Sequence, residues 1–272
     1  MKIAVCFKAL ADYTRLSPND WKWDENYFVD TSFVPRIFNC FEESALEMAL
    51  KLSKKPGDGS ELHELTAITV DGQQGDLFLK HLMAVGYDHG IRIQCKKKPD
   101  LRFNSLAVSR LISSYITQQG QNLAILGMQG GEGDNGQTGF FVAENLGWPC
   151  INRVTRFEMD QGLDSLRVTS RIAGADLVQT VKLPLVLIIG HSLDSPYLRV
   201  PNLKQKLNAK KKKATILSDI ELKVDTDINK DKILTDLQQH GADRACIFIK
   251  GKNAKEQAQI LYDQFLKKRL SL

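Results

Sequence analysis

The sequence predicts an α/β fold: a Rossmann-like, mostly parallel sheet with helices on both faces, an added antiparallel hairpin region, and a C-terminal arm. Three features support this class. Up to residue 149, short apolar runs alternate with segments of helical periodicity, which is typical of a parallel sheet with crossover helices. Between residues 154 and 181, three strand-like segments are separated only by tight turns, which indicates antiparallel pairing. Beyond residue 214, too few elements remain to bury an independent core.

The composition is that of an ordinary globular protein and disfavours several functional classes. Of the 272 residues, 43% are hydrophobic and 25% are charged, and the net charge is +5. The longest apolar run, residues 183–189, is far shorter than the roughly 20 residues that span a bilayer, so no membrane insertion is expected. The five cysteines and five histidines are scattered, which favours reduced thiols in the cytoplasm and predicts no metal site. The chain shows neither a signal-peptide pattern nor a nucleic-acid-binding signature.

Four strands and four helices alternate in the first half of the chain. The strands are predicted at residues 3–7, 65–70, 90–95 and 123–126, and the helices at residues 39–55, 76–85, 104–119 and 140–146. Asn39 and Asn104 are predicted to cap their helices, because an asparagine oxygen can accept hydrogen bonds from free N–H groups. The alternating pattern of residues 90–95 predicts a less buried strand near an edge. Residues 10–38 show no period and are predicted to form a long excursion.

The second half contains the hairpin region and the arm. Antiparallel strands are predicted at residues 154–159, 166–172 and 177–181, followed by a buried strand at 183–190 and a polar segment at 191–213. The predicted nucleotide-binding domain therefore covers residues 1–214. The arm covers residues 215–272, with a linker at 218–231, a strand at 245–249 and a helix at 253–268. We expect this arm to dock on a partner, because its apolar residues need a surface from elsewhere.

The glycine-rich stretch at residues 127–139 is the main candidate for a binding site. It joins the strand at 123–126 to the next helix, and glycine lets backbone N–H groups approach a ligand closely. Gln137 and Thr138 lie where the helix begins, at an end that attracts anions. If this strand neighbours the first one, the loop, Lys8 and Val70 meet where strand order reverses. The alternative is a loop without a ligand, since the sequence matches neither GxxxxGK[ST] nor GxGxxG.

Several blocks of the sequence resemble the electron transfer flavoprotein beta subunit. Residues 39–45, Asn-Cys-Phe-Glu-Glu-Ser-Ala, are similar to the family's Asn-Pro-Phe-x-Glu-x-Ala block, with cysteine for proline. Residues 83–88 and 147–149 resemble its Ala-Met-Gly-Ala-Asp and Gly-Trp-Pro blocks. The loop at 127–139 resembles its Gly-x-Gln-x-x-x-x-Asp-x-x-Gln-x-Gly loop, and residues 183–212 resemble its Leu-Pro to Lys-Lys-Lys region. Their shared order and spacing indicate a member of this family, in a divergent bacterial subgroup.

The resemblance implies an electron-transfer subunit that pairs with an alpha subunit holding the redox FAD. The beta subunit of this family binds AMP structurally, or a second FAD in electron-bifurcating members. No catalytic residue is implied, since the flavin carries the chemistry. Carried over to this chain, the cofactor-binding residues would be Cys6, Phe7, Lys8, Asn39, Cys40, Phe41, Glu42, Val70, Met128, Gln129, Gly130, Gly131, Gly133, Asp134, Asn135, Gly136, Gln137, Thr138 and Gly139.

One region departs from the family pattern, and other functions stay open. Residues 194–198, Asp-Ser-Pro-Tyr-Leu, stand where the family has Asn-x-Pro-Arg-Tyr, in a region resembling the loop that docks partner dehydrogenases. The region from Asp194 to Lys210 is therefore the expected docking site, with the dehydrogenase unspecified. The alternatives are a stand-alone adenine-nucleotide-binding enzyme or sensor of similar fold, and an interaction subunit whose pocket has degenerated. The absence of a P-loop lysine disfavours phosphoryl transfer. Cys6 is expected to be a buried apolar thiol, because no histidine lies near it in the sequence.

Overall fold

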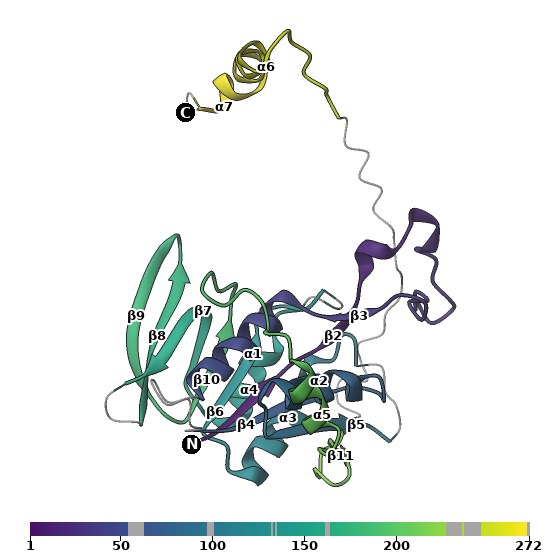
Figure 1. Cartoon of the computed structure of the whole chain (residues 1–272), viewed down its shortest axis with the longest axis vertical. Coiled ribbons are helices and arrows are strands. Elements are labelled where there is room, and N and C mark those ends of the chain that lie inside the picture. Colours follow the sequence, from purple (N-terminus) through teal and green to yellow (C-terminus); the bar gives the residue numbers. More distant parts are fainter. Residues whose placement is uncertain are drawn as a thin grey trace. The chain divides into compact units, whose positions relative to one another are not determined.

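The computed structural model describes residues 1–53, 63–96, 101–131, 133, 135–160, 164–226, 236 and 246–270 (Figure 1). The chain divides into two compact units, Met1–Ile233 and Leu234–Leu272. The first unit contains a large, mostly parallel sheet with helices on both faces, so the predicted fold class is confirmed. Among the described residues, every helix is too short or too polar to cross a membrane.

Nine strands form one continuous sheet in the order β11-β5-β4-β1-β6-β10-β7-β8-β9. From β11 to β7, all neighbours are parallel, whereas β8 pairs antiparallel with both β7 and β9. The antiparallel hairpin therefore extends the main sheet, because β7 is parallel to β10 along its other edge. The strands are β1 (Lys2–Cys6), β4 (Glu64–Val70), β5 (His89–Gln94), β6 (Leu123–Gly127), β7 (Cys150–Met159), β8 (Ser165–Ile172), β9 (Ala175–Lys182), β10 (Leu185–Ile189) and β11 (Thr215–Ser218).

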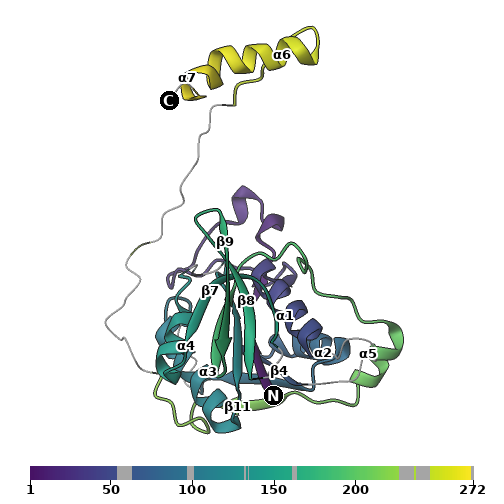
Figure 2. The same cartoon turned by 90° about the vertical axis from the view of Figure 1, so that its left-hand side faces the viewer.

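The helices pack on the two faces of this sheet in separate layers (Figure 2). Helices α1 (Cys40–Leu52) and α2 (Gly75–Val85) cover one face, where they share a core with Ile3 and Val5 of β1. Helices α3 (Ser105–Gln119) and α4 (Thr138–Leu146) cover the other, where they meet Ala4 and Cys6. Successive residues of β1 thus enter opposite cores, which explains why the central strands are apolar throughout rather than alternating.

The predicted excursion after β1 contains a small second sheet. Strand β2 (Ala9–Ala11) pairs antiparallel with β3 (Arg36–Phe38), which leads directly into α1. Between them lie two short 3₁₀ helices, Tyr13–Arg15 and Pro18–Asp20. The excursion thus returns to the carboxyl end of β1, and it places Phe28 and Arg36 near that end.

Two local predictions are corrected. Asn39 occupies the N-cap position of α1, but its side chain accepts no cap hydrogen bond, because its amide donates to the Glu42 carboxylate and the Gln129 carbonyl instead. Strand β5 lies next to the edge strand as predicted, but residues 90–93 are buried. β11 covers the outer side of β5, and Arg92 is paired with Asp76 at 2.7 Å. The cap by Asn104 is confirmed, since its side chain accepts a hydrogen bond from the N–H of Ala107 at 3.0 Å.

The start of the predicted arm belongs to the main sheet. β11 pairs in parallel with β5, and Leu222 beyond it is buried in the core under α3 and α4. Residues 215–222 are therefore part of the first unit, not of an arm or a linker. The polar segment before them contains α5 (Leu203–Ala209), which packs against α2.

The second unit contains a short helical segment. Helix α6 (Ala254–Leu261) starts after Asn253, whose side chain accepts a hydrogen bond from the N–H of Glu256 at 2.9 Å. A π-helical turn (Tyr262–Leu266) and α7 (Lys267–Leu270) continue it, so the predicted helix at 253–268 is confirmed. The predicted strand is wrong for residues 246–249, which have no regular secondary structure, because no described strand is available there for pairing; Ala245 lies outside the described residues.

Candidate functional site

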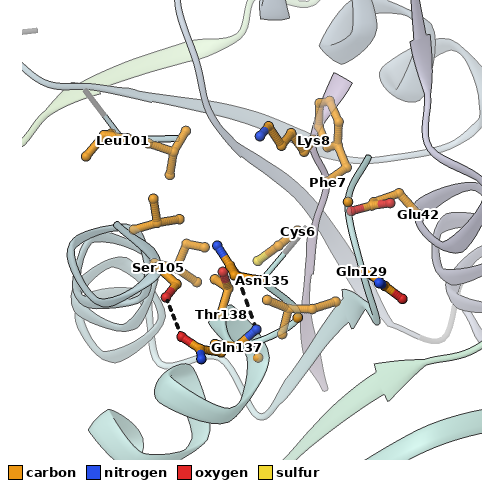
Figure 3. A pocket seen from close by; sticks show the side chains of 18 of the residues that line it. Cys6, Phe7, Lys8, Glu42, Leu101, Ser105, Gln129, Asn135, Gln137 and Thr138 are labelled. Carbon is orange, nitrogen blue, oxygen red and sulfur yellow. Dashed lines mark hydrogen bonds between the residues drawn. The ribbon is translucent and has the colours of Figure 1, made fainter. Parts of the chain in front are cut away.

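The carboxyl ends of β1 and β6 lie side by side, and a cavity opens beyond them. β1 pairs with β4 on one side and with β6 on the other, so strand order reverses between β1 and β6. The cavity has a volume of about 510 Å³, within the range of small-molecule sites. Figure 3 shows Cys6, Asn135 and Thr138 gathered around it. The sequence-based expectation that β1 and β6 are neighbours is thus confirmed.

Most of the site residues expected from the sequence line this cavity. They come from the end of β1, the first turns of α1, the end of β4 and the loop between β6 and α4. The members of this set are Cys6, Phe7, Lys8, Glu42, Val70, Met128, Gln129, Gly130, Asn135, Gly136, Gln137, Thr138 and Gly139.

Five expected residues do not line the cavity. Asn39 lies outside the lining, but its amide donates hydrogen bonds to two lining residues, at the Glu42 carboxylate and the Gln129 carbonyl. Cys40 is exposed, and Phe41 lines a different hollow above β7 and β8. Gly131 packs near Leu10, and Gly133 packs against the carbonyl of Arg102, which a Cβ atom would approach to 2.3 Å. Asp134 lies outside the described residues.

Of the remaining lining residues, Gly127 belongs to the glycine-rich stretch predicted as a binding site, whereas the others lie outside the predicted set. All of these remaining residues come from the excursion, from the ends of β4 and β6, from the segment before α3, and from α3 itself. They are Phe28, Arg36, Ile68, Asp71, Leu101, Arg102, Ser105, Val108, Ile112, Leu126 and Gly127. The only signal for α3 was its predicted start at Asn104, just before Ser105.

Two glycines of the loop are required by close packing. A Cβ atom on Gly127 would lie 2.8 Å from Cδ of Glu42, so glycine there lets the carboxyl group lie against the end of β6. A Cβ atom on Gly139 would lie 2.7 Å from two side-chain carbons of Ile188, so glycine there lets α4 pack onto β10. Gly136 has φ +59°, a conformation that glycine adopts without strain.

The N-terminus of α4 points into the cavity. Gln137 holds the N-cap position, where its N–H donates to the Asn135 side-chain oxygen at 3.2 Å and its own side-chain oxygen accepts from the Ser105 hydroxyl at 3.3 Å (Figure 3). Because the first N–H groups of a helix have no acceptor within it, those at the start of α4 remain available to a ligand. This end of the cavity is therefore suited to an anionic group.

Glu42 is the most perturbed acid of the cavity. Its side chain is 7% exposed, and this burial raises the pKa of its carboxyl group to about 7. The hydrogen bond from Asn39, and to a lesser degree the charge of Lys8, oppose that rise in pKa. At neutral pH the group is thus partly protonated, which lessens its repulsion of a bound anion.

Two arginines connect the cavity to the excursion. Arg36 forms an ion pair with Asp71 at 2.9 Å and also donates to the carbonyl of Ala9. Arg102 lies over the ring of Phe28, 3.5 Å from its centroid, and donates to backbone carbonyls of residues 26 and 27. These contacts hold residues 26–28 beside the cavity, and the two guanidinium groups make its surroundings more positive.

The cavity offers a binding site rather than a nucleophile. Cys6 lies at its floor, and burial raises the pKa of the Cys6 thiol to about 12, with the charge of Glu42 adding to the effect. The thiol is therefore protonated at physiological pH, as expected of a buried apolar cysteine. Among the described residues, no group of three or more histidine, cysteine, aspartate or glutamate side chains could hold a metal ion.

Comparison with known proteins assigns the chain to a family. The family profile described as "Electron transfer flavoprotein domain" matches residues 28–222. The chain belongs to the electron transfer flavoprotein family. The match covers most of the first unit, including much of the cavity, and it confirms the resemblance that the sequence blocks indicate.

Individual members of the electron transfer flavoprotein family are similar over most of this chain. YgcR of Escherichia coli (strain K12), which carries a provisional name as an electron transfer flavoprotein subunit, is 29% identical over 277 residues, or 99% of each chain. The electron transfer flavoprotein subunit beta of Homo sapiens is 28% identical over 229 residues, 83% of this chain and 84% of its own. That of Bacillus subtilis (strain 168) is 28% identical over 199 residues, 73% of this chain and 74% of its own.

The segment that departs from the family pattern is fixed firmly to α1. Arg199 forms an ion pair with Glu47 at 2.6 Å, and the ammonium group of Lys51 donates to the carbonyl of Asp194 and the hydroxyl of Ser195, each at 2.7 Å. Between and directly beside these anchors, large apolar side chains are exposed to solvent. The exposed ones are Leu193, Tyr197 and Val200.

Proposed function

We propose that this chain is the beta-type subunit of an electron transfer flavoprotein, which binds an adenine nucleotide and positions the flavin of an alpha-type subunit. The observation that supports it most is the cavity at the β1–β6 switch point, with the start of α4 directed into it. Open α/β sheets bind ligands at this place.

The residues present fit an adenine nucleotide. The phosphate would be held by the N–H groups at the start of α4, aided by the hydroxyl of Thr138. Apolar side chains on the other wall, from Val70, Val108 and Ile112, suit the adenine ring. AMP and FAD share this adenosine half, so the proposal covers AMP or a second FAD. A flavin accepts and donates electrons when bound, whereas the chain's own residues bind it and orient it.

We further propose that the partner alpha subunit carries FAD and is anchored by the second unit. Large apolar side chains of that unit are solvent-exposed, among them Phe248, Leu261 and Leu270. Exposed apolar surface of this kind marks a protein interface. The segment between Asp194 and Lys210 is proposed as the docking site for a dehydrogenase, because its exposed apolar residues are held in a fixed conformation by Arg199 and Lys51.

Truncation tests the anchoring proposal. Because β11 completes the main sheet, the deletion begins at residue 234 and leaves the first unit whole. The truncated and full-length chains are each co-expressed with an electron transfer flavoprotein alpha subunit. We expect the full-length complex to co-purify with flavin, and the truncated chain to fold but to lose the complex. Equal recovery of both complexes would contradict the anchoring role of residues 234–272.

A further inference from the structure

A second hollow lies over the antiparallel end of the sheet, and its lining shares Met128 with the cavity beyond β1 and β6. Its volume is about 940 Å³, and it is bounded by β7, β8, β9 and the segment after β10. Figure 1 shows β8 and β9 as a hairpin at the end of the sheet. Four arginines line the hollow: Arg153, Arg156, Arg167 and Arg171, here called the arginine face.

Strand register explains why the arginines share one side of the sheet. Along β8, Arg167 and Arg171 lie an even number of positions apart, so both point to the same face, and both are exposed. Leu166 and Val168, on the opposite face, are buried in the core. Arg156 lies opposite Thr169 across the β7–β8 ladder, on the same side. The antiparallel end of the sheet therefore has an apolar face toward the core and a basic face toward solvent.

Acidic residues balance only part of this charge. Asp176 lies opposite Arg171 and is paired with it at 2.8 Å, Glu158 lies opposite Arg167, and Asp194 also lines the hollow. In the described part of the chain, no carboxylate forms an ion pair with Arg153, Arg156 or Arg167. Arg156 faces a threonine across the ladder rather than an acid. Among the described residues, Arg153 and Arg156 are thus the two arginines of the hollow that neither form an ion pair nor lie opposite an acidic residue across the sheet.

The rest of the hollow has the composition of a protein interface. Apolar side chains of Phe41, Met128 and Leu193 line it together with the arginines, and Leu193 is 80% exposed. Arginine, methionine and aromatic residues are the types enriched at interfaces. Next to the hollow, β9 is an edge strand whose Leu177 and Val178 are about half exposed, with no described strand beyond it. Long exposed edges are usually protected in proteins that stay alone.

We propose that the arginine face is a docking surface for an acidic segment of the flavin-carrying partner subunit, whose carboxylates pair with Arg153 and Arg156. This inference rests on the proposed function, since it assumes that such a partner exists. An acidic segment satisfies both features of the hollow: its charge matches the guanidinium groups of Arg153 and Arg156, and its backbone can lie along the apolar floor. Arginine binds carboxylates through two parallel hydrogen bonds, which also fixes their orientation.

The test compares two double variants that lose the same charge. R153Q/R156Q removes the two cations of the arginine face that lie opposite no acidic residue among those described. The control, K80Q/R110Q, removes two exposed cations from α2 and α3. Dissociation constants for the purified partner subunit are measured at low and high salt. We expect R153Q/R156Q to weaken binding by about 10-fold or more at low salt and to flatten the salt dependence. K80Q/R110Q should bind like the original chain.

Further arms separate the inference from its alternatives. R153K/R156K keeps the charge but not the paired hydrogen bonds, so we expect intermediate affinity. Unchanged affinity and salt dependence in R153Q/R156Q, with nucleotide content intact, would overturn the arginine face while leaving the proposed function standing. If the isolated chain binds inorganic pyrophosphate and R153Q/R156Q abolishes that binding, the arginine face is a site for a small anion, and its role in docking the partner is overturned. If the complex of the original chain contains no adenine nucleotide besides the partner's FAD, the proposed function is refuted instead.

Discussion

Replacing Glu42 by glutamine should change how the stability of the fold depends on pH. Burial raises the pKa of Glu42 from 4.5 to about 7, so the folded chain holds a proton that the unfolded chain releases. A raised carboxyl pKa contributes stability that is fully present below the unfolded pKa and is lost as pH rises through the folded pKa. At roughly 1.4 kcal/mol per pKa unit, the loss between these two pKa values amounts to about 3 kcal/mol.

Glutamine has nearly the same shape as glutamate and does not ionise, so E42Q should escape this loss. Its amide oxygen can still accept the hydrogen bond from Asn39, and Gly127 leaves room for the amide nitrogen. Relative to the original chain, the free energy of unfolding of E42Q should be similar near pH 4.5 and higher by about 3 kcal/mol near pH 8.

Urea unfolding across this pH range is the assay, with E144Q as the control. Glu144 is exposed on α4, so its substitution removes the same charge from a solvated position. E144Q should follow the pH dependence of the original chain. Parallel curves for E42Q and the original chain would show that Glu42 is ionised without penalty, and the assignment of a buried, partly protonated acid beside the cavity would be refuted.

Two further predictions concern the loop and α4. Thr138→Val removes a hydroxyl at the start of α4 and should weaken nucleotide binding by about 0.5–3 kcal/mol, depending on which polar group is left unpaired. Calorimetry on nucleotide-depleted protein measures this difference, and equal affinities of the variant and the original chain would show that Thr138 does not contact the nucleotide. Gly139→Ala places a carbon against Ile188 and should lower the free energy of unfolding by about 1–3 kcal/mol. Gly72 has open space around it, so Gly72→Ala is the control and should change the free energy of unfolding little. Similar decreases in both variants would speak against close packing of α4 on β10.

The sheet could be predicted from the sequence because its strands have strong local signals. Parallel strands that are buried on both faces appear as continuous apolar runs. The helices between them begin or end at a capping residue or a glycine, as at Asn104, Gly86 and Gly147. β11 lacked this signal: two of its residues are exposed, and only its pairing with β5 places it in the sheet. The predicted boundary at residue 214 therefore preceded a strand that belongs to the first unit.

The parts of the candidate site that depend on neighbouring residues in the sequence could be predicted, whereas the parts that depend on contacts between distant residues could not. The glycine loop and the end of β1 could be located from their own residues. The wall formed by Arg102 and Phe28 could not, because these residues are far apart in the sequence and the excursion has no period. Asn39 was misjudged for a related reason: its amide is engaged by Gln129, a distant residue that competes with capping.

The chemical identity of the bound molecule is the most direct measurement of the proposed function. The native complex of the full-length chain with its flavoprotein partner is denatured by heat, and the released small molecules are separated by chromatography and identified by mass. We expect an adenine nucleotide from this chain in addition to the partner's FAD: AMP, or a second FAD seen as a doubled flavin content. A native complex that releases the partner's FAD and no further adenine nucleotide would contradict nucleotide binding at the β1–β6 cavity.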